Sequence, residues 1–180
     1  MKKILFIILG ILILEKNFVF SQTNIKFIDV NYIYQNSTAG KKINQQIKDK
    51  SKKISKKIDD YKKDIDNKKQ KLISQKNIIS EEAYKETFVK IEKEIKEINS
   101  LIAKDNQKII KFTNDAKVIF LKELNKIMED YSIENSIDMI IKKENILIGK
   151  NSLESTKEIL EIFDKEVKQI KIKWSYQKKK

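Results

Sequence analysis

The apolar positions of this chain change period along its length, and each change predicts a different element. Ile25–Val30 is mostly apolar on both alternating faces, which is typical of a strand covered on both sides. From Ile43 onward the apolar residues instead form two narrow stripes at helical spacing, the second following a heptad of three and four residues. The first stripe is Ile43, Ile47, Ile54, Ile58, Tyr61, Ile65 and Leu72; the second is Phe88, Ile91, Ile95, Ile98, Ile102, Ile109, Phe112, Ala116 and Ile119.

The two stripes predict two long helical arms. A seam this narrow suits one helix lying along another, and Asp105 fills the one slot of the second stripe where an apolar residue is missing. The first stripe loses register at residues 73–80, and Ser80 before Glu81 and Glu82 is typical of a helix N-cap with an acidic first turn. No Gly or Pro marks the join, so one unbroken helix is the alternative. The cap and the lost register favour an antiparallel hairpin.

The segment after the arms predicts strands and a last helix. Residues 137–141 and 145–148 are short apolar runs, which predict a β-hairpin that ends at Gly149. Ser155 and Glu158 have the spacing of a capping box. The helix that follows carries an apolar stripe: Ile159, Leu160, Phe163, Val167 and Ile170.

Strand material therefore brackets the arms, and the predicted fold is α+β and mostly helical. Residues 22–39 and 132–172 form a small β-rich body with a C-terminal helix, 40–131 form the hairpin arm, and 173–180 form a loose basic tail. A body of about fifty residues is too small to be stable easily alone, so we expect it to oligomerise through its strands. The predicted body core or subunit interface is Ile25, Phe27, Ile28, Val30, Ile137, Met139, Ile141, Ile146 and Ile148.

The N-terminus has the layout of a secretory signal peptide covering residues 1–21. Lys2 and Lys3 precede an apolar run, Ile4–Leu14, and Val19–Ser21 provides acceptable side chains for cleavage before Gln22. The run is much shorter than the ~20 residues that span a bilayer. We expect export and cleavage. The alternative is a coiled-coil stalk tethered to a membrane by an uncleaved N-terminal segment.

The net charge of +13 predicts an acidic partner, although a broad bias toward Lys, Ile and Asn could also produce it. The charge is uneven: residues 41–80 hold 14 Lys and 5 acidic residues, whereas 81–131 hold 10 Lys and 11 acidic residues. An anionic membrane surface is a further candidate partner. The chain has no Arg, the preferred bidentate partner of phosphate and guanine, and its aromatics are scattered. We therefore expect no nucleic-acid binding.

Residue types needed for most enzymatic chemistry are missing. The chain has no Cys and no His, which excludes disulfides and thiol nucleophiles and makes zinc sites and His-based acid–base catalysis implausible. No carboxylate stands out as catalytic. We expect no enzymatic activity, no metal site and no cofactor.

Three segments resemble the Skp (OmpH-like) family of periplasmic chaperones: IKFIDVNYIYQNSTAGKK, SIDMIIKKENILIG and LESTKEILEIFDK. Their order and spacing, with two charged arms between the first two, carry the resemblance. It implies a periplasmic homotrimer whose strands form a barrel between subunits and whose arms enclose a cavity. It also implies an ATP-independent holdase for unfolded outer-membrane proteins. The chain departs from the family in its Lys-rich tail after Trp174 and its lack of Arg, so no lipopolysaccharide site is carried over.

The tip of the hairpin provides the candidate client-binding residues. Near the body, Ile43, Ile47, Ile119 and Ile127 are expected to hold the two arms together. Near the tip, the apolar side chains have less partner helix to cover them, and we predict that they contact clients or line the cavity. These residues are Ile78, Ile79, Tyr84 and Phe88.

Overall fold

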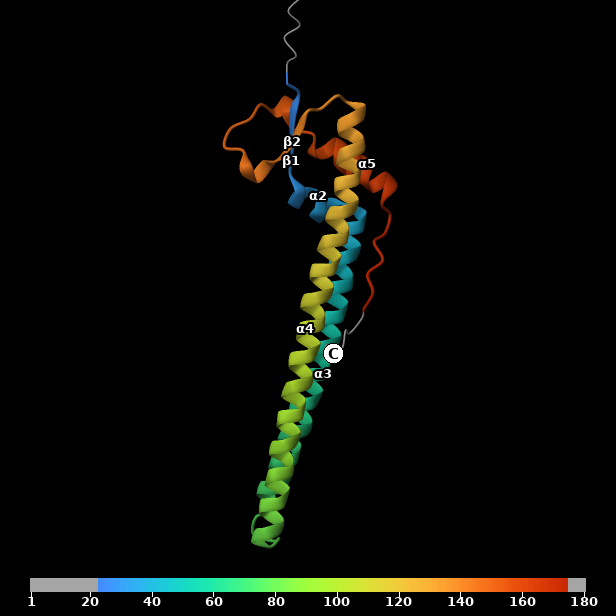
Figure 1. The fold of residues 1–180 in the computed structure, drawn as a ribbon. Helices are drawn as coiled ribbons and strands as arrows, with labels where there is room; N and C mark the ends of the chain where they lie inside the picture. Colours follow the sequence, from blue (N-terminus) through green and yellow to red (C-terminus); the bar gives the residue numbers. More distant parts are fainter. Residues whose placement is uncertain (1–22, 175–180) are drawn as a thin grey trace, which may run out of the picture.

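A computed structural model describes residues 23–174 and has the shape of a small body with one long helical hairpin (Figure 1). The predicted signal peptide and residues 175–180 lie outside the described part. Two short single-turn 3₁₀ helices, Lys143–Asn145 and Asn151–Leu153, lie in the body. The main elements are β1 (Ile25–Ile28), α2 (Val30–Asn36), α3 (Thr38–Ser74), α4 (Glu81–Glu134), β2 (Met139–Lys142) and α5 (Thr156–Glu166).

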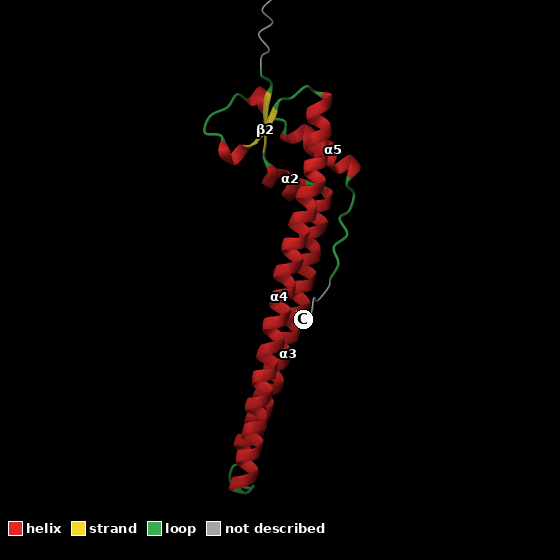
Figure 2. Ribbon diagram, in the orientation of Figure 1, coloured by secondary structure: helices red, strands yellow, loops and turns green. Residues whose placement is uncertain are grey.

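The hairpin prediction is confirmed, and the alternative of one unbroken helix is wrong. Helices α3 and α4 lie side by side along the arm and are joined by a turn at residues 75–80 (Figures 1 and 2). Ser80 caps α4 as expected, because its Oγ accepts a hydrogen bond of 3.2 Å from the backbone N–H of Ala83. The carboxylates of Glu81 and Glu82 then occupy the first turn, where the helix dipole favours them.

The sheet differs from the predicted β-hairpin. Strand β2 pairs with β1, in parallel, with Ile25 opposite Met139 and Ile28 opposite Lys142. Residues 145–148 form no strand. The other edge of β1 is occupied by the chain near residue 154: Phe27 forms a bridge with Glu154 and accepts a 3.0 Å backbone hydrogen bond from Ser155. Because β2 and the segment at residue 154 occupy the two edges of β1, residues 145–148 cannot pair with it.

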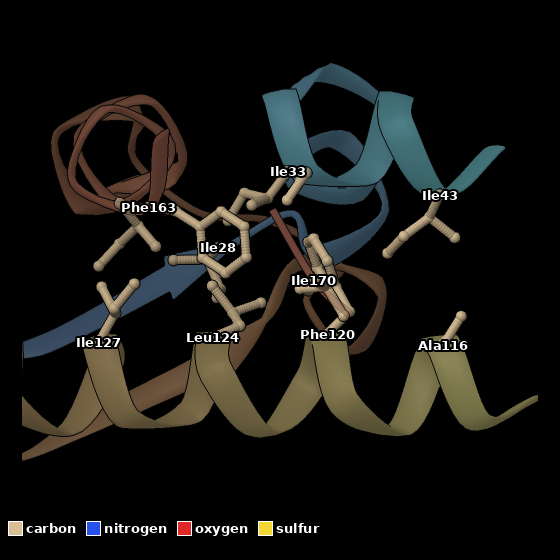
Figure 3. Close-up of a cluster of buried hydrophobic side chains, with 11 residues drawn as sticks. Ile28, Ile33, Ile43, Ala116, Phe120, Leu124, Ile127, Phe163 and Ile170 are labelled. Atoms are coloured by element: carbon tan, nitrogen blue, oxygen red, sulfur yellow. The ribbon is translucent and has the colours of Figure 1, made fainter. Parts of the chain in front are cut away.

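The core lies where the body meets the upper end of the arm (Figure 3). Helix α4 presents Ala116, Phe120, Leu124 and Ile127 on one face, and the remaining elements pack against that face. The ring centroid of Phe120 lies 4.7 Å from that of Phe163 on α5. The buried residues of this cluster are Ile28, Ile33, Ala39, Ile43, Ala116, Phe120, Leu124, Ile127, Ile159, Phe163 and Ile170.

The predicted set of body residues divides into three groups. Phe27, Ile28 and Ile137 are buried within the single chain. Ile25, Val30, Ile141 and Ile146 are half-buried. Met139 and Ile148 are exposed, together with Leu147, which the sequence analysis did not select.

The capping box predicted at α5 is not formed. A capping box needs the Glu158 side chain to accept from the backbone N–H of Ser155, but that N–H already donates to Phe27 of β1. Glu158 instead accepts a hydrogen bond from the Tyr131 hydroxyl at the end of α4. The pairing of β1 therefore overrides the local capping pattern.

A tight corner between α2 and α3 sets the direction of the arm. Ser37 caps α3, and its Oγ accepts from the N–H of Gly40 at 3.1 Å. A Cβ at Gly40 would lie 1.8 Å from the carbonyl oxygen of Tyr34, so a residue with a side chain does not fit here. The carboxylate of Asp164 on α5 accepts from the backbone N–H of Thr38 at 2.6 Å and fixes this corner to the body.

Candidate functional site

The tip of the arm is closed by a compact turn. Backbone hydrogen bonds link Lys76 N–H to Ile73 O at 3.2 Å and Ile78 N–H to Gln75 O at 2.9 Å. The Ser80 cap then starts α4 at once. These bonds use the backbone groups of the turn locally, so the apolar side chains beside it are free to face solvent or a partner.

Tyr84 and Phe88, two of the four predicted client-binding residues, line one groove at the tip. The groove has a volume of ≈ 290 Å³, and Leu72 and Ile73 of α3 form its opposite wall. Leu72 is buried, whereas Ile73 and Phe88 are exposed. The tip therefore presents an apolar surface that the two helices do not cover themselves.

The other two predicted residues are not part of this groove. Ile78 is exposed in the turn and Ile79 is half-buried beside it. Two exposed apolar residues at the tip were not predicted: Ile73, which lines the groove, and Val89, which lies on α4 next to Phe88. Each lies one position outside a predicted stripe, next to Leu72 and Phe88. An apolar residue just off a helical stripe is the pattern that could have identified them.

A second groove continues the first one toward the middle of the arm. It has a volume of ≈ 220 Å³ and shares Lys69 and Ile95 with the tip groove. Its apolar walls come from both helices: Ile58, Tyr61, Ile65, Ile95, Ile98 and Ile102. The two grooves together form an apolar track along the seam of the hairpin, rimmed by the lysines of α3.

The charge along this track is strongly positive on α3. Eleven of its thirteen lysines are exposed, and only Lys50 and Lys68 are half-buried. Lys68 joins the helices, since its Nζ lies 2.7 Å from Asp64 of α3 and 2.5 Å from Glu94 of α4. The hydrogen bonds that the Lys68 ammonium donates to the carboxylates of Asp64 and Glu94 raise the pKa of Lys68, which stays charged.

Within residues 23–174, no group of three or more acidic side chains could hold a metal ion. No helix in this range has an apolar stretch long enough to cross a bilayer. The Ile4–Leu14 run, on which a tethered stalk would depend, lies outside the described residues.

The sequence pattern of the OmpH-like outer membrane proteins matches residues 24–163. The chain belongs to the OmpH-like family. None of the curated proteins matches this sequence. Among solved structures, it is similar to one described as an OmpH-like outer membrane chaperone of Caulobacter crescentus, with a TM-score of 0.78 and 12% identity. The similarity covers 84% of this chain and 89% of that one, and at this identity it establishes a shared fold.

The OmpH-like match ends within α5, and the chain continues beyond it. Helix α5 ends at Glu166, so Val167 and Ile170 are not helical as the sequence analysis expected. Trp174, which was predicted to belong to a loose tail, instead packs its ring on Phe112 of α4 with 5.3 Å between ring centroids. Residues 167–174 thus form an ordered extension of this OmpH-like chain.

Proposed function

We propose that this protein is a chaperone of the holdase type, which binds unfolded outer-membrane proteins and keeps them from aggregating without using ATP. Its OmpH-like family and fold support a chaperone role. The observation that carries the proposal is the apolar tip groove formed by Leu72, Ile73, Tyr84 and Phe88 on an arm rimmed by lysines. A holdase needs weak contacts spread over a large surface, and the track of two adjoining grooves can provide them.

The charge distribution supports the same proposal. Exposed lysines on α3 attract acidic unfolded chains over distances of about 10 Å and raise the rate of encounter. The apolar track then holds the captured segment. Attraction at long range and adhesion at short range are thus assigned to different residues of the same arm.

Light scattering of a urea-unfolded outer-membrane β-barrel protein, diluted into buffer with and without the chaperone, tests this proposal. The variants Ile73→Ser and Val89→Ser should lose protection against aggregation severalfold. Their matched controls are Ile110→Ser and Val118→Ser, because the exposed fractions are 60% for both Ile73 and Val89, 61% for Ile110 and 67% for Val118. Equal protection by all four variants would refute the assignment of binding to the tip.

We propose further that three chains assemble through their bodies. Strand β2 has a hydrogen-bonding neighbour on one edge only within the described residues, and Met139, Leu147 and Ile148 expose apolar surface beside it. Leu147 is 98% and Ile148 91% exposed in the single chain. Native mass spectrometry should give three times the chain mass.

The interface variant has to be chosen with care. Ile28 is buried in the core of its own chain, so Ile28→Asp would unfold the body rather than test assembly. Leu147→Asp together with Ile148→Asp should instead yield folded monomers. A trimer that survives this double change would place the interface elsewhere.

We also propose that the protein works in the periplasm after cleavage before Gln22 and acts by binding alone, without catalysing a reaction. The signal-peptide pattern and the lack of His and Cys support these two points. The intact mass of protein recovered from the periplasm tests the first point. A mass that includes residues 1–21 would favour a tethered stalk.

A further inference from the structure

Residues 167–174, called the strap here, run back from α5 along the upper part of the arm (Figures 1 and 2). The strap has no regular secondary structure. Two contacts fix its position on the arm: Lys42 of α3 donates to the carbonyl of Lys168 at 3.0 Å, and the Lys50 ammonium lies 4.1 Å from the ring centroid of Trp174. The strap therefore covers the arm from the level of Lys42 to that of Lys50.

From Ile170 to Trp174, the side chains of the strap alternate between the arm and solvent, with Trp174 42% exposed. Ile170 is buried in the core, Ile172 is half-buried against it, and the Trp174 ring packs on Phe112. Lys171 and Lys173 between them are exposed. An extended chain with this alternation has the pattern of a β-strand that is apolar on one face.

The outer end of the strap is held by the contacts of Trp174 with Lys50 and Phe112, and no hydrogen bond among the described residues joins residues 171–174 to the arm. Within residues 23–174, the bond from Lys42 is the one hydrogen bond that joins the strap to the arm. The two neighbouring segments are also both basic: the strap contains Lys168, Lys171 and Lys173 and no acidic residue, and residues 41–57 of α3 contain eight Lys and one Asp. Segments with few backbone hydrogen bonds open at low free-energy cost. Ile170 anchors the strap, whereas residues 171–174 can detach.

We propose that residues 171–174 are a displaceable cover over the face of the arm around Phe112, and that this covered face takes an extended segment with alternating apolar and acidic residues. Such a segment reproduces the apolar contacts of Ile172 and Trp174 and replaces the repulsion between lysines by attraction. The strands of outer-membrane β-barrels alternate in this way. The identity of the natural occupant thus rests on the proposed holdase function, but the covered face and its cover do not.

Displacement can be measured without a client protein. The probe is a labelled peptide of residues 167–180 with Lys168, Lys171 and Lys173 replaced by Glu and Trp174 replaced by Phe. Trp174 is the only Trp of the chain, so its fluorescence reports directly whether the strap is seated. On the full-length protein, the probe should bind and shift Trp174 emission to longer wavelength, as the ring leaves Phe112 for solvent.

Two full-length variants change the strap in opposite directions. Ile172→Ser with Trp174→Ser removes the apolar contacts of the outer end, and should bind the probe about tenfold more tightly than the wild type. Lys171→Glu with Lys173→Glu turns repulsion into attraction, and should bind it severalfold more weakly. Circular dichroism and thermal unfolding check that both variants keep the fold, which is expected because Ile170 is untouched.

Equal affinity of the probe for the three proteins would overturn the proposal. It would also be overturned if a probe with Ser at the positions of Ile170, Ile172 and Trp174 bound as well as the first, since charge alone would then explain binding. These outcomes are independent of the aggregation assay. A failure of the holdase function would leave competition between strap and probe intact, and a failure of the strap proposal would leave the effects of Ile73→Ser and Val89→Ser intact.

Discussion

The Nζ of Lys57 on α3 lies 3.2 Å from Oδ2 of Asp105 on α4, and this ion pair crosses the seam of the arm. Asp105 also accepts from Lys108 at 2.7 Å, and its side chain is mostly buried. Asp105 occupies a heptad position of α4 at which an apolar residue is expected. A polar residue at a seam position fixes register at a cost in stability, so we interpret the pair as the device that aligns the two helices.

Replacing Asp105 by Leu should therefore stabilise the arm and loosen its alignment. We expect the free energy of unfolding to rise by about 1 kcal/mol, because ion pairs shielded from water are often less stabilising than apolar packing. Urea unfolding followed by circular dichroism measures the change. Asp105→Ala should lower stability, because it removes the ion pair across the seam and leaves a cavity. A lower stability of the Leu variant as well would contradict our interpretation.

The same pair makes the stability of the arm depend on pH. The hydrogen bond from Lys108, assisted by that from Lys57, holds the pKa of Asp105 below its ordinary value in the folded state. The stabilisation is therefore fully present above the unfolded pKa of about 3.9 and is lost as the pH falls through the lower folded pKa. Between about pH 4 and pH 2, the wild type should lose more stability than Asp105→Asn. If the free energy of unfolding fell equally with pH in the two proteins, Asp105 would not be the source of the pH dependence.

Gly40→Ala should destabilise the body by about 2–3 kcal/mol, the upper range for overpacking. The added Cβ would meet the Tyr34 carbonyl, which is backbone and cannot rotate away. Gly149→Ala is the matched control, since its Cβ would lie 3.1 Å from the movable ring edge of Phe27. Thermal unfolding should show a clearly larger loss for Gly40→Ala, and comparable losses would contradict the steric argument.

Ser136→Gly should make the protein more stable by about 0.5–1 kcal/mol. Helix α4 ends in a Schellman motif, with hydrogen bonds from Ile137 N–H to Ser132 O at 2.9 Å and from Ser136 N–H to Ile133 O at 3.3 Å. Ser136 has φ = 49°, a left-handed conformation that favours glycine. The control Asn135→Gly, at φ = −105°, should bring no gain in a chemical denaturation experiment.

Client capture should slow by about tenfold as salt rises from ~20 to ~150 mM, because exposed charges are then screened within ~8 Å. Stopped-flow measurement of the association rate with an acidic unfolded β-barrel protein tests this. The dissociation rate should change much less, since apolar contacts of the track hold the bound chain. A rate of association independent of salt would refute the role of the α3 lysines in capture.

The sequence predicted the arm well because its evidence is local. Register is lost just where Ser80 begins α4, and a helix cap depends only on nearby residues. The body was predicted less well because its pattern depends on distant partners. Residues 145–148 are apolar enough for a strand, but the bridge between Phe27 and Glu154 occupies that edge of β1. Ser155 and Glu158 have the spacing of a capping box, but the N–H of Ser155 donates to Phe27 and Glu158 accepts from Tyr131.

The difference between local and distant evidence also explains which residues of the tip and the strap were predicted. Tyr84 and Phe88 were selected because little partner helix remains near the turn, which is a matter of position along the chain. Ile172 and Trp174 were missed because Val167 and Ile170 fit the helical stripe of α5. In so short a segment, the same apolar residues fit both a helix and an alternating strand. Only the observed end of α5 at Glu166 distinguishes the two patterns.

The parallel pairing of β1 with β2 makes the two ends of the arm interdependent during folding. The backbone N–H of Asn24 donates to Asp138 at 2.7 Å, across a separation of 114 residues. Contacts so distant in sequence form slowly, whereas the intervening helices depend mainly on local contacts. The folding chain thus passes through a stage with a formed arm and an open sheet edge, and during that interval it is itself vulnerable to misassociation.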